Sequence, residues 1–310
     1  MTAKTVSLLI LMGQLVGAIV LISVMSKPSH QASFASAMEF WADEVRDADG
    51  IGQQLIRVSA SKETVFGDKA AREILAANPV RPAQENYVTR VGQSVALNAL
   101  RKGITYHFHV IESSEINAFA LPGGQIFVTT GMLNFIQSEA ELAAVLGHEI
   151  SHVDLRHCVS RYQYQLALGS EGPGAIAEVA DLARSPLIAA YSKYEESEAD
   201  VQGVTFAFEA GYDPRAMVDL LTRLEHYSPD PKPSARSAGP LDEVMQASTD
   251  AYVVYSRSHP LDRERIADLA RLLARDADRL GQRNVYEGIE NYRRQVPMEE
   301  RKYPGESKVW

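Results

Sequence analysis

The five residues His148-Glu149-Ile150-Ser151-His152 constrain the fold of this chain more than any other segment. On an α-helix, residues four positions apart lie on one face, so two imidazoles at that spacing can bind one ion at about 2.0–2.1 Å. The pattern therefore predicts a helix that carries two zinc ligands, His148 and His152.

The residues around this motif favour the same helix. Ser138 and Glu141 form a capping box, so we expect the helix to run from there to about Tyr164. Apolar residues recur at helical spacing and predict a face turned toward the core: Leu142, Val145, Leu146, Ile150 and Val153.

Glu149 projects beside the metal-binding face of this helix. Zinc lowers the pKa of a bound water to about 7, and a neighbouring carboxylate can accept its proton as the water attacks a carbonyl. We therefore predict that Glu149 is the general base of a hydrolase that holds one zinc ion per chain.

A catalytic zinc site has three protein ligands and one open position. The pattern H-E-x-x-H-x-x-G-x-x-H would supply a third histidine, but Leu155 stands at its glycine position and Cys158 at its last position. His157 comes one residue too early, and we interpret it as a residue of the helix end or one that orients a ligand.

A second helix, predicted from about Tyr194 to Ala210, offers carboxylates instead. Glu196 and Asp200 lie four apart on one face, so Glu196 could bind the metal while Asp200 accepts the free N–H of a liganding histidine. Spacing alone does not separate Glu196 from Glu195 or Glu198. An acidic, solvated helix start is the other interpretation of these residues.

The remaining pattern is mostly helical with a little sheet. Residues 104–111 alternate like a half-buried strand, with His107 and His109 as structural residues on its exposed face. Pro122-Gly123-Gly124 predicts a turn, and Gln125–Thr130 a second strand. The predicted fold is α+β, predominantly helical: a zincin (gluzincin) metalloprotease domain with a small sheet and an edge strand.

The first residues predict a membrane segment. Thr5–Met25 is 21 uncharged residues, enough to cross the hydrocarbon core as a helix. A poor cleavage site favours an uncleaved anchor over a removed signal, and the placement of Lys4 and Lys27 favours a catalytic domain on the periplasmic side. The predicted organisation is 1–26 anchor or signal, 27–39 linker, 40–285 metallopeptidase domain and 286–310 loosely ordered tail.

Composition excludes some classes of protein. The formal net charge is -9 without a basic stripe, which argues against a nucleic-acid partner. Cys158 is the only cysteine, so the chain has neither an internal disulfide nor a cysteine-based zinc site.

Three segments in order, Asn117–Gly124, Gly147–His152 and Glu196–Asp200, resemble the HtpX/BepA/Oma-type zinc metallopeptidases, relatives of the CAAX prenyl proteases. Ala210–Pro214 and Ser258–Pro260 are similar to further segments of that family, and the resemblance covers about Phe40 to about Leu280. The HExxH motif alone is shared by many zincins, whereas the ordered set is more specific.

The resemblance implies roles that spacing leaves open. It implies that Glu196 is the third zinc ligand and Asp200 its outer partner. It also implies that His259 could act as a switch that closes the site, and that Gln125–Thr130 is the edge strand that pairs with an extended peptide. An oxyanion donor and a loop residue before a helix are the other interpretations of His259. The family members with several spans or a helical repeat array differ from this chain, in which one span and no repeat are visible.

These observations together predict a membrane-tethered zinc endopeptidase that degrades misfolded or misassembled envelope polypeptides. Two alternatives stay open: a chaperone-like binding protein of the same fold, in which cleavage is secondary, and a zinc hydrolase of small substrates. A peptide-pairing strand argues against the small-substrate enzyme, because a small substrate needs no strand pairing. The oligomeric state is left open.

Overall fold

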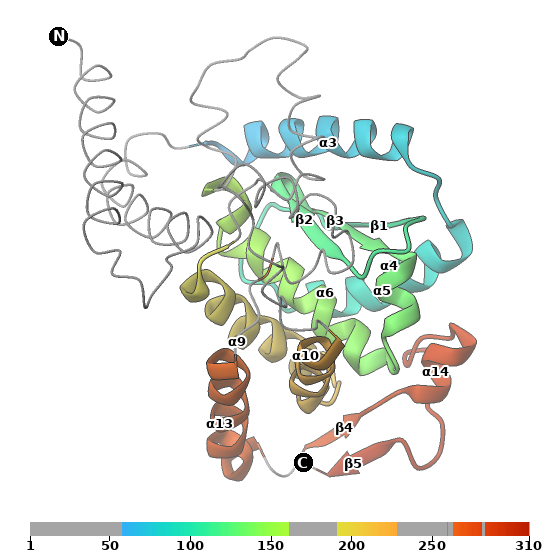
Figure 1. The fold of residues 1–310 in the computed structure, drawn as a ribbon, viewed down its shortest axis with the longest axis vertical. Coiled ribbons are helices and arrows are strands. Elements are labelled where there is room, and N and C mark those ends of the chain that lie inside the picture. The colour runs from blue at the N-terminus through green and yellow to red at the C-terminus, as the bar shows by residue number, and fades with distance from the viewer. Residues whose placement is uncertain (1–57, 161–190, 228–258, 260–262, 281–282, 310) are drawn as a thin grey trace, which may run out of the picture. The chain divides into compact units, whose positions relative to one another are not determined.

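A computed structural model describes residues 58–160, 191–227, 259, 263–280 and 283–309 (Figure 1). All of these belong to one unit, formed by Val58–Lys232 and Asp250–Trp310. The predicted anchor and linker, residues 1–26 and 27–39, lie outside the described residues. Within the described part of the chain, no helix is both long and apolar enough to cross a membrane.

A three-stranded sheet forms the centre of the fold. Its strand order is β1 (His107–Ile111), β3 (Gln125–Thr129) and β2 (Ala118–Leu121). β1 pairs with β3 in parallel and β2 pairs with β3 antiparallel, through the turn η1 (Pro122–Gly124).

The prediction that Gln125–Thr130 is the edge strand is wrong, because β3 lies between β1 and β2. All five residues of β3 are buried, as expected for a strand with neighbours on both sides and helices over both faces. A β-branched run predicts a strand but does not reveal the order of strands in a sheet. Of the strands that the structure describes, β1 and β2 lie at the two edges of this sheet, and β2 directly precedes the turn.

Helices cover both faces of the sheet (Figure 1). α3 (Ala60–Ala77) packs on one face, where Phe66 and Ile74 join Phe127 in an apolar cluster. α4 (Pro82–Ala96) and α6 (Glu139–Asp154) cover the other face, and Ile126 and Val128 join their cluster. Phe127 thus faces one side of the sheet and its neighbours Ile126 and Val128 face the other, which is the period-two pattern of a strand.

α6 and α9 (Lys193–Glu209) pack at very short range. A Cβ atom added to Gly147 would lie 2.5 Å from the Gly203 carbonyl oxygen, and one added to Gly203 would lie 2.6 Å from the His148 backbone nitrogen. These two glycines therefore allow the two helix backbones to touch, which brings the acidic first turn of α9 against the histidines of α6.

Three further helices complete this arrangement. α5 (Thr130–Phe135) connects the sheet to α6, and α10 (Arg215–Tyr227) and α13 (Arg263–Leu280) follow α9. α6 ends at Asp154 rather than near Tyr164, because the backbone of Arg156 is left-handed, with φ 67°, before helical backbone resumes at His157.

The segment predicted to be a loose tail is folded instead. It contains α14 (Ile289–Arg294) and β5 (Ser307–Val309), and β5 pairs antiparallel with β4 (Asn284–Tyr286), which ends where the predicted tail begins. The carbonyls of Gly288 and Glu287 accept the first backbone N–H groups of α6, at 3.1 Å and 3.0 Å. Such long-range hydrogen bonds leave no periodic signal in the sequence, which is why the segment is predicted to be loose.

Candidate metal centre

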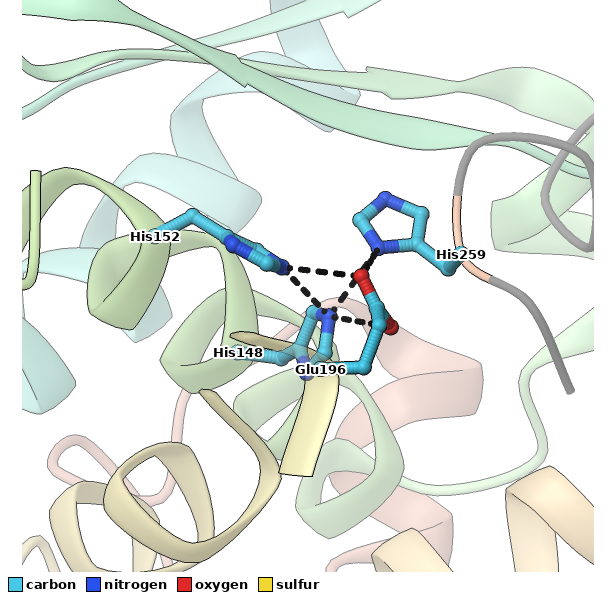
Figure 2. Close-up of side chains that lie close together, drawn as sticks. All are labelled: His148, His152, Glu196 and His259. Carbon is cyan, nitrogen blue, oxygen red and sulfur yellow. Dashed lines mark hydrogen bonds and ion pairs between the residues drawn. The ribbon is translucent and has the colours of Figure 1, made fainter. Parts of the chain in front are cut away.

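α6 turns both histidines of the motif toward one point. His148 and His152 are fully buried, and their Nε2 atoms lie 3.0 Å apart (Figure 2). The helix brings them there because Ser138 caps it through the Glu141 backbone and the apolar stripe fixes its rotation.

α9 supplies the carboxylate. Ser192 and Glu195 form a capping box at its start, which uses the Glu195 carboxylate as an acceptor for the Ser192 backbone. Glu196 points the other way and is fully buried, 3.6 Å from His148 Nε2 and 3.4 Å from His152 Nε2. Of the three glutamates that spacing left open, Glu196 is therefore the one placed against both histidines.

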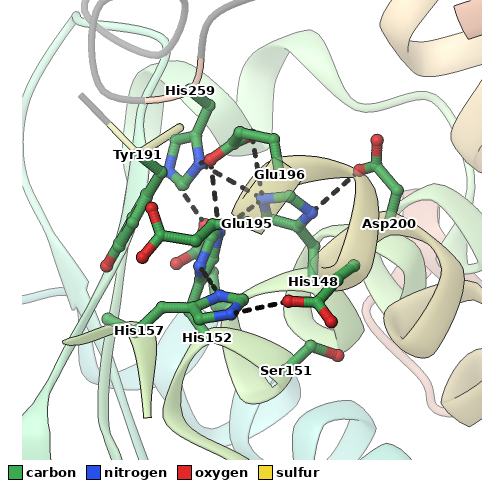
Figure 3. A network of polar contacts seen from close by, with 12 residues as sticks. His148, Ser151, His152, His157, Tyr191, Glu195, Glu196, Asp200 and His259 are labelled. Atoms are coloured by element: carbon green, nitrogen blue, oxygen red, sulfur yellow. Dashed lines mark hydrogen bonds and ion pairs between the residues drawn. The ribbon is translucent and has the colours of Figure 1, made fainter. Parts of the chain in front are cut away.

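Asp200 lies one turn further along α9, behind His148. Its Oδ1 is 2.9 Å from His148 Nδ1, so it accepts that N–H and leaves Nε2 facing Glu196 (Figure 3). Burial alone would lower the pKa of His148, but the hydrogen bond to Asp200 and the charge of Glu196 raise it above its ordinary value. For His152 burial prevails, and its pKa lies well below the ordinary value.

Arg265 from α13 also contacts the cluster, and the sequence patterns did not predict this. It is buried, its Nη1 lies 2.6 Å from Glu196 Oε2, and its Nε and Nη2 donate to the Asp200 carboxylate. Although burial raises the pKa of each carboxyl, cationic neighbours that include Arg265 hold both pKa values below their ordinary range. One sequence feature could have indicated a buried Arg265: it stands four residues before Leu269, on the apolar stripe of an amphipathic helix.

His259 joins the same cluster. It is fully buried, with Nδ1 3.1 Å from His148 Nε2 and 2.9 Å from Glu196 Oε1 (Figure 2). Its Nε2 lies 3.4 Å from Oε1 of Glu149, which is also fully buried. The structure thus brings all the predicted site residues together, and places His259 between the predicted base and Glu196.

Two aromatic rings enclose His152. Tyr191, also missed from the sequence, stacks on it with ring centroids 3.8 Å apart and an interplanar angle of 15°. His157 is buried and its Nδ1 lies 3.0 Å from His152 Nδ1. Burial lowers the pKa of His157. His107 and His109 lie away from this site on β1, where His109 contacts Gln125 at 2.8 Å.

The donor set fits a zinc ion. One ligand atom from each of His148, His152, Glu196 and His259 lies within 4.8 Å of the others, and all four residues are buried. Donors of a tetrahedral site with bonds of about 2.0–2.1 Å lie about 3.3 Å apart. The measured separations among them, such as 3.0 Å between the Nε2 atoms and 3.4 Å from His152 to Glu196, are close to that spacing. Imidazole nitrogen with carboxylate oxygen is a common zinc set.

A protein-family model shows where this chain belongs. The model of peptidase family M48 matches residues 82–273, well over half of the 310 residues. The chain belongs to peptidase family M48. This family membership confirms the predicted resemblance, the zincin fold class and the prediction of a zinc metallopeptidase domain.

Curated relatives cover part of the same region. The beta-barrel assembly-enhancing protease of Escherichia coli is 28% identical over 231 residues, 68% of this chain and 44% of that protein. That of Yersinia pestis is 29% identical over 190 residues, 55% of this chain and 39% of that protein. The mitochondrial metalloendopeptidase OMA1 of Schizosaccharomyces pombe is 32% identical over 147 residues, 45% of this chain and 43% of that protein. The chain thus spans less than half of the length of these relatives.

Proposed function

We propose that this protein is a zinc-dependent endopeptidase in which His148, His152 and Glu196 bind the metal and Glu149 is the general base. The observation that carries the proposal is the buried cluster of two imidazoles from α6 and one carboxylate from α9, two helices whose backbones are in contact. Glu149 directly follows His148 on α6 and is also buried. A zinc ion held there supplies Lewis-acid activation of a water and of the peptide carbonyl.

Three side chains perform proton transfer, ligand orientation and charge balance at this site. Glu149 accepts a proton from the attacking water and returns it to the leaving amine. Asp200 accepts a hydrogen bond from the Nδ1–H of His148 and keeps that ring in the tautomer whose Nε2 can bind metal. Arg265 balances the charges of Glu196 and Asp200, so that two buried carboxylates can stand side by side.

An extended polypeptide is the proposed substrate, and β2 replaces β3 as the proposed docking strand. The Thr129 backbone N–H donates to the Asn117 carbonyl at 3.0 Å, so Asn117, Phe119 and Leu121 direct their backbone groups toward β3. The backbone groups of Ala118 and Ala120 therefore point away from β3, where the Ala120 carbonyl also accepts a hydrogen bond from Cys158 Sγ at 3.5 Å. A peptide added there gains main-chain hydrogen bonds with little sequence specificity.

We further propose that the enzyme acts in quality control of cell-envelope proteins, anchored by Thr5–Met25 with its catalytic domain on the periplasmic side. The alternative location is a soluble periplasmic protein after signal cleavage. Supporting this role are the apolar segment itself and relatives named as a beta-barrel assembly-enhancing protease and as mitochondrial metalloendopeptidases. Misfolded or misassembled envelope polypeptides are the corresponding substrates.

His259 is proposed to hold the site closed. A catalytic zinc site keeps one position open, whereas here His259 is the fourth donor of the cluster. Movement of this residue would open that position to substrate. The contact between His259 and Glu149 supports the same role, because it engages the proposed base.

The test measures zinc content and casein hydrolysis on the purified full-length chain. Glu149→Gln should keep zinc and lose hydrolysis by about 10²–10⁴-fold, as expected for a lost general base. Glu196→Ala should lose zinc, and full zinc occupancy in this variant would disprove the assignment of the third ligand. A matched control is His226→Ala, an exposed histidine of α10 whose loss should change neither measurement.

His259→Ala separates the two roles considered for this residue. A closed site predicts a gain in casein hydrolysis, whereas an oxyanion role predicts a loss. Glu149→Gln also addresses the chaperone-like alternative, because a protein that acts by binding would retain its function in cells without the general base.

A further inference from the structure

The second histidine of α6 has its own chain of contacts, separate from the pairing of His148 with Asp200. His152 Nδ1 lies 3.0 Å from His157 Nδ1 (Figure 3). His157 Nε2 lies 3.5 Å from Glu198 Oε2. The Tyr194 hydroxyl donates to Glu198 Oε1 at 2.9 Å. The chain of contacts therefore leads from the metal-facing ring through a buried imidazole to a carboxylate on α9.

The contact between His152 and His157 depends on where α6 ends. On a continuous helix, a residue five positions after His152 would lie about 140° around the axis from it. Here α6 ends at Asp154, and Arg156 adopts a left-handed conformation with φ 67°, so the chain turns and His157 faces His152. The left-handed region is uncommon for a residue other than glycine. Arg156 is held there partly by its side chain, which donates to the Val58 carbonyl at 2.8 Å.

The proton positions along this chain follow from the geometry. His152 Nε2 faces His148 and Glu196, so it must present a lone pair if it is to bind a metal. Nδ1 of His152 then carries the proton and donates to His157 Nδ1. As an acceptor at Nδ1, a neutral His157 carries its own proton on Nε2, which faces Glu198. Between His152 and Glu198 each N–H therefore faces an acceptor, and Glu198 is approached by donors from both His157 and Tyr194.

We propose that His157 is the positioning residue for His152: it accepts a hydrogen bond from the Nδ1–H of His152, is anchored by Glu198, and holds the ring with Nε2 toward the metal. The inference rests on the proposed metal centre. His148 has an anion, Asp200, in the corresponding place, so the two histidine ligands are oriented by different chemistry. This also gives Glu198 a role other than that of a ligand.

The test compares His157→Phe and His157→Asn in the full-length chain. Phenylalanine keeps a ring but removes the acceptor, and loss of an orienting partner lowers metal affinity by about 10- to 100-fold. Asparagine can place its Oδ1 near the position of Nδ1, so it should restore most of the affinity. Zinc affinity is measured by competition with a chromophoric chelator, with His107→Asn on the exposed face of β1 as the control that should not change it.

A second readout is independent of any variant's folding. ¹⁵N NMR of the zinc-loaded wild type should show the proton of His152 on Nδ1 and that of His157 on Nε2. A proton on Nδ1 of His157, wild-type zinc affinity in His157→Phe, or equal losses in the phenylalanine and asparagine variants would overturn the inference. A wild type that binds no zinc would instead disprove the proposed metal centre, so the two failures are distinguishable.

Discussion

At the scale of single residues, Arg265 raises the question of how Glu196 and Asp200 are both kept ionised in the core. Isolated carboxylates are strongly disfavoured there, and one guanidinium contacts both of them. A bound metal would add positive charge beside Glu196. The contribution of Arg265 to stability should therefore depend on whether the metal is present.

Arg265→Met is expected to destabilise the metal-free protein more than the zinc-loaded protein. Removal of one partner from a buried ion pair costs about 3–5 kcal/mol, and zinc can offset part of that loss by neutralising Glu196. Thermal unfolding of both forms, with and without a chelator, measures the difference. Equal losses in the two forms would mean that Arg265 acts through packing alone.

At the scale of elements, the alternation of backbone groups along β2 gives the proposed substrate contact a testable signature. Peptides with single N-methyl amides should lose kcat/KM by roughly two- to tenfold when the methyl blocks a hydrogen bond to Ala118 or Ala120, since one such bond contributes about 0.5–1.5 kcal/mol. Methylation one residue away should have little effect. Losses at every position, or at none, would contradict strand pairing.

The same elements show what could be predicted from the sequence. The local patterns predicted α6 and α9, because caps and apolar stripes are properties of single helices. They failed for the order of strands, which depends on contacts between distant segments. For the same reason the sequence did not predict that Arg265 and Tyr191 contact the cluster, because their neighbours come from distant elements.

At the scale of the whole molecule, Glu139 joins segments that are far apart in the sequence. Its buried carboxylate accepts hydrogen bonds from the hydroxyls of Tyr87 and Tyr212, at 2.7 Å and 2.9 Å, and from the Met298 backbone at 2.7 Å. Residues 283–309 are thereby tied to α4 and to the start of α6, the helix that carries the proposed ligands. Their folding and the position of the metal site are thus connected through one side chain.

Glu139 should make the stability of the fold depend on pH. Burial raises the pKa of its carboxyl above the ordinary value, despite the hydrogen bonds it accepts from Tyr87, Met298 and Tyr212. A raised folded-state pKa means that this group's contribution is fully present below its unfolded-state pKa and declines as the pH rises through the folded-state value. Glu139→Gln removes this titration, so the unfolding free energy of the wild type should fall relative to that of the variant as the pH rises above about 4.5. Denaturant unfolding of both proteins across that range measures the difference, and parallel pH profiles would show that Glu139 does not titrate differently in the folded state.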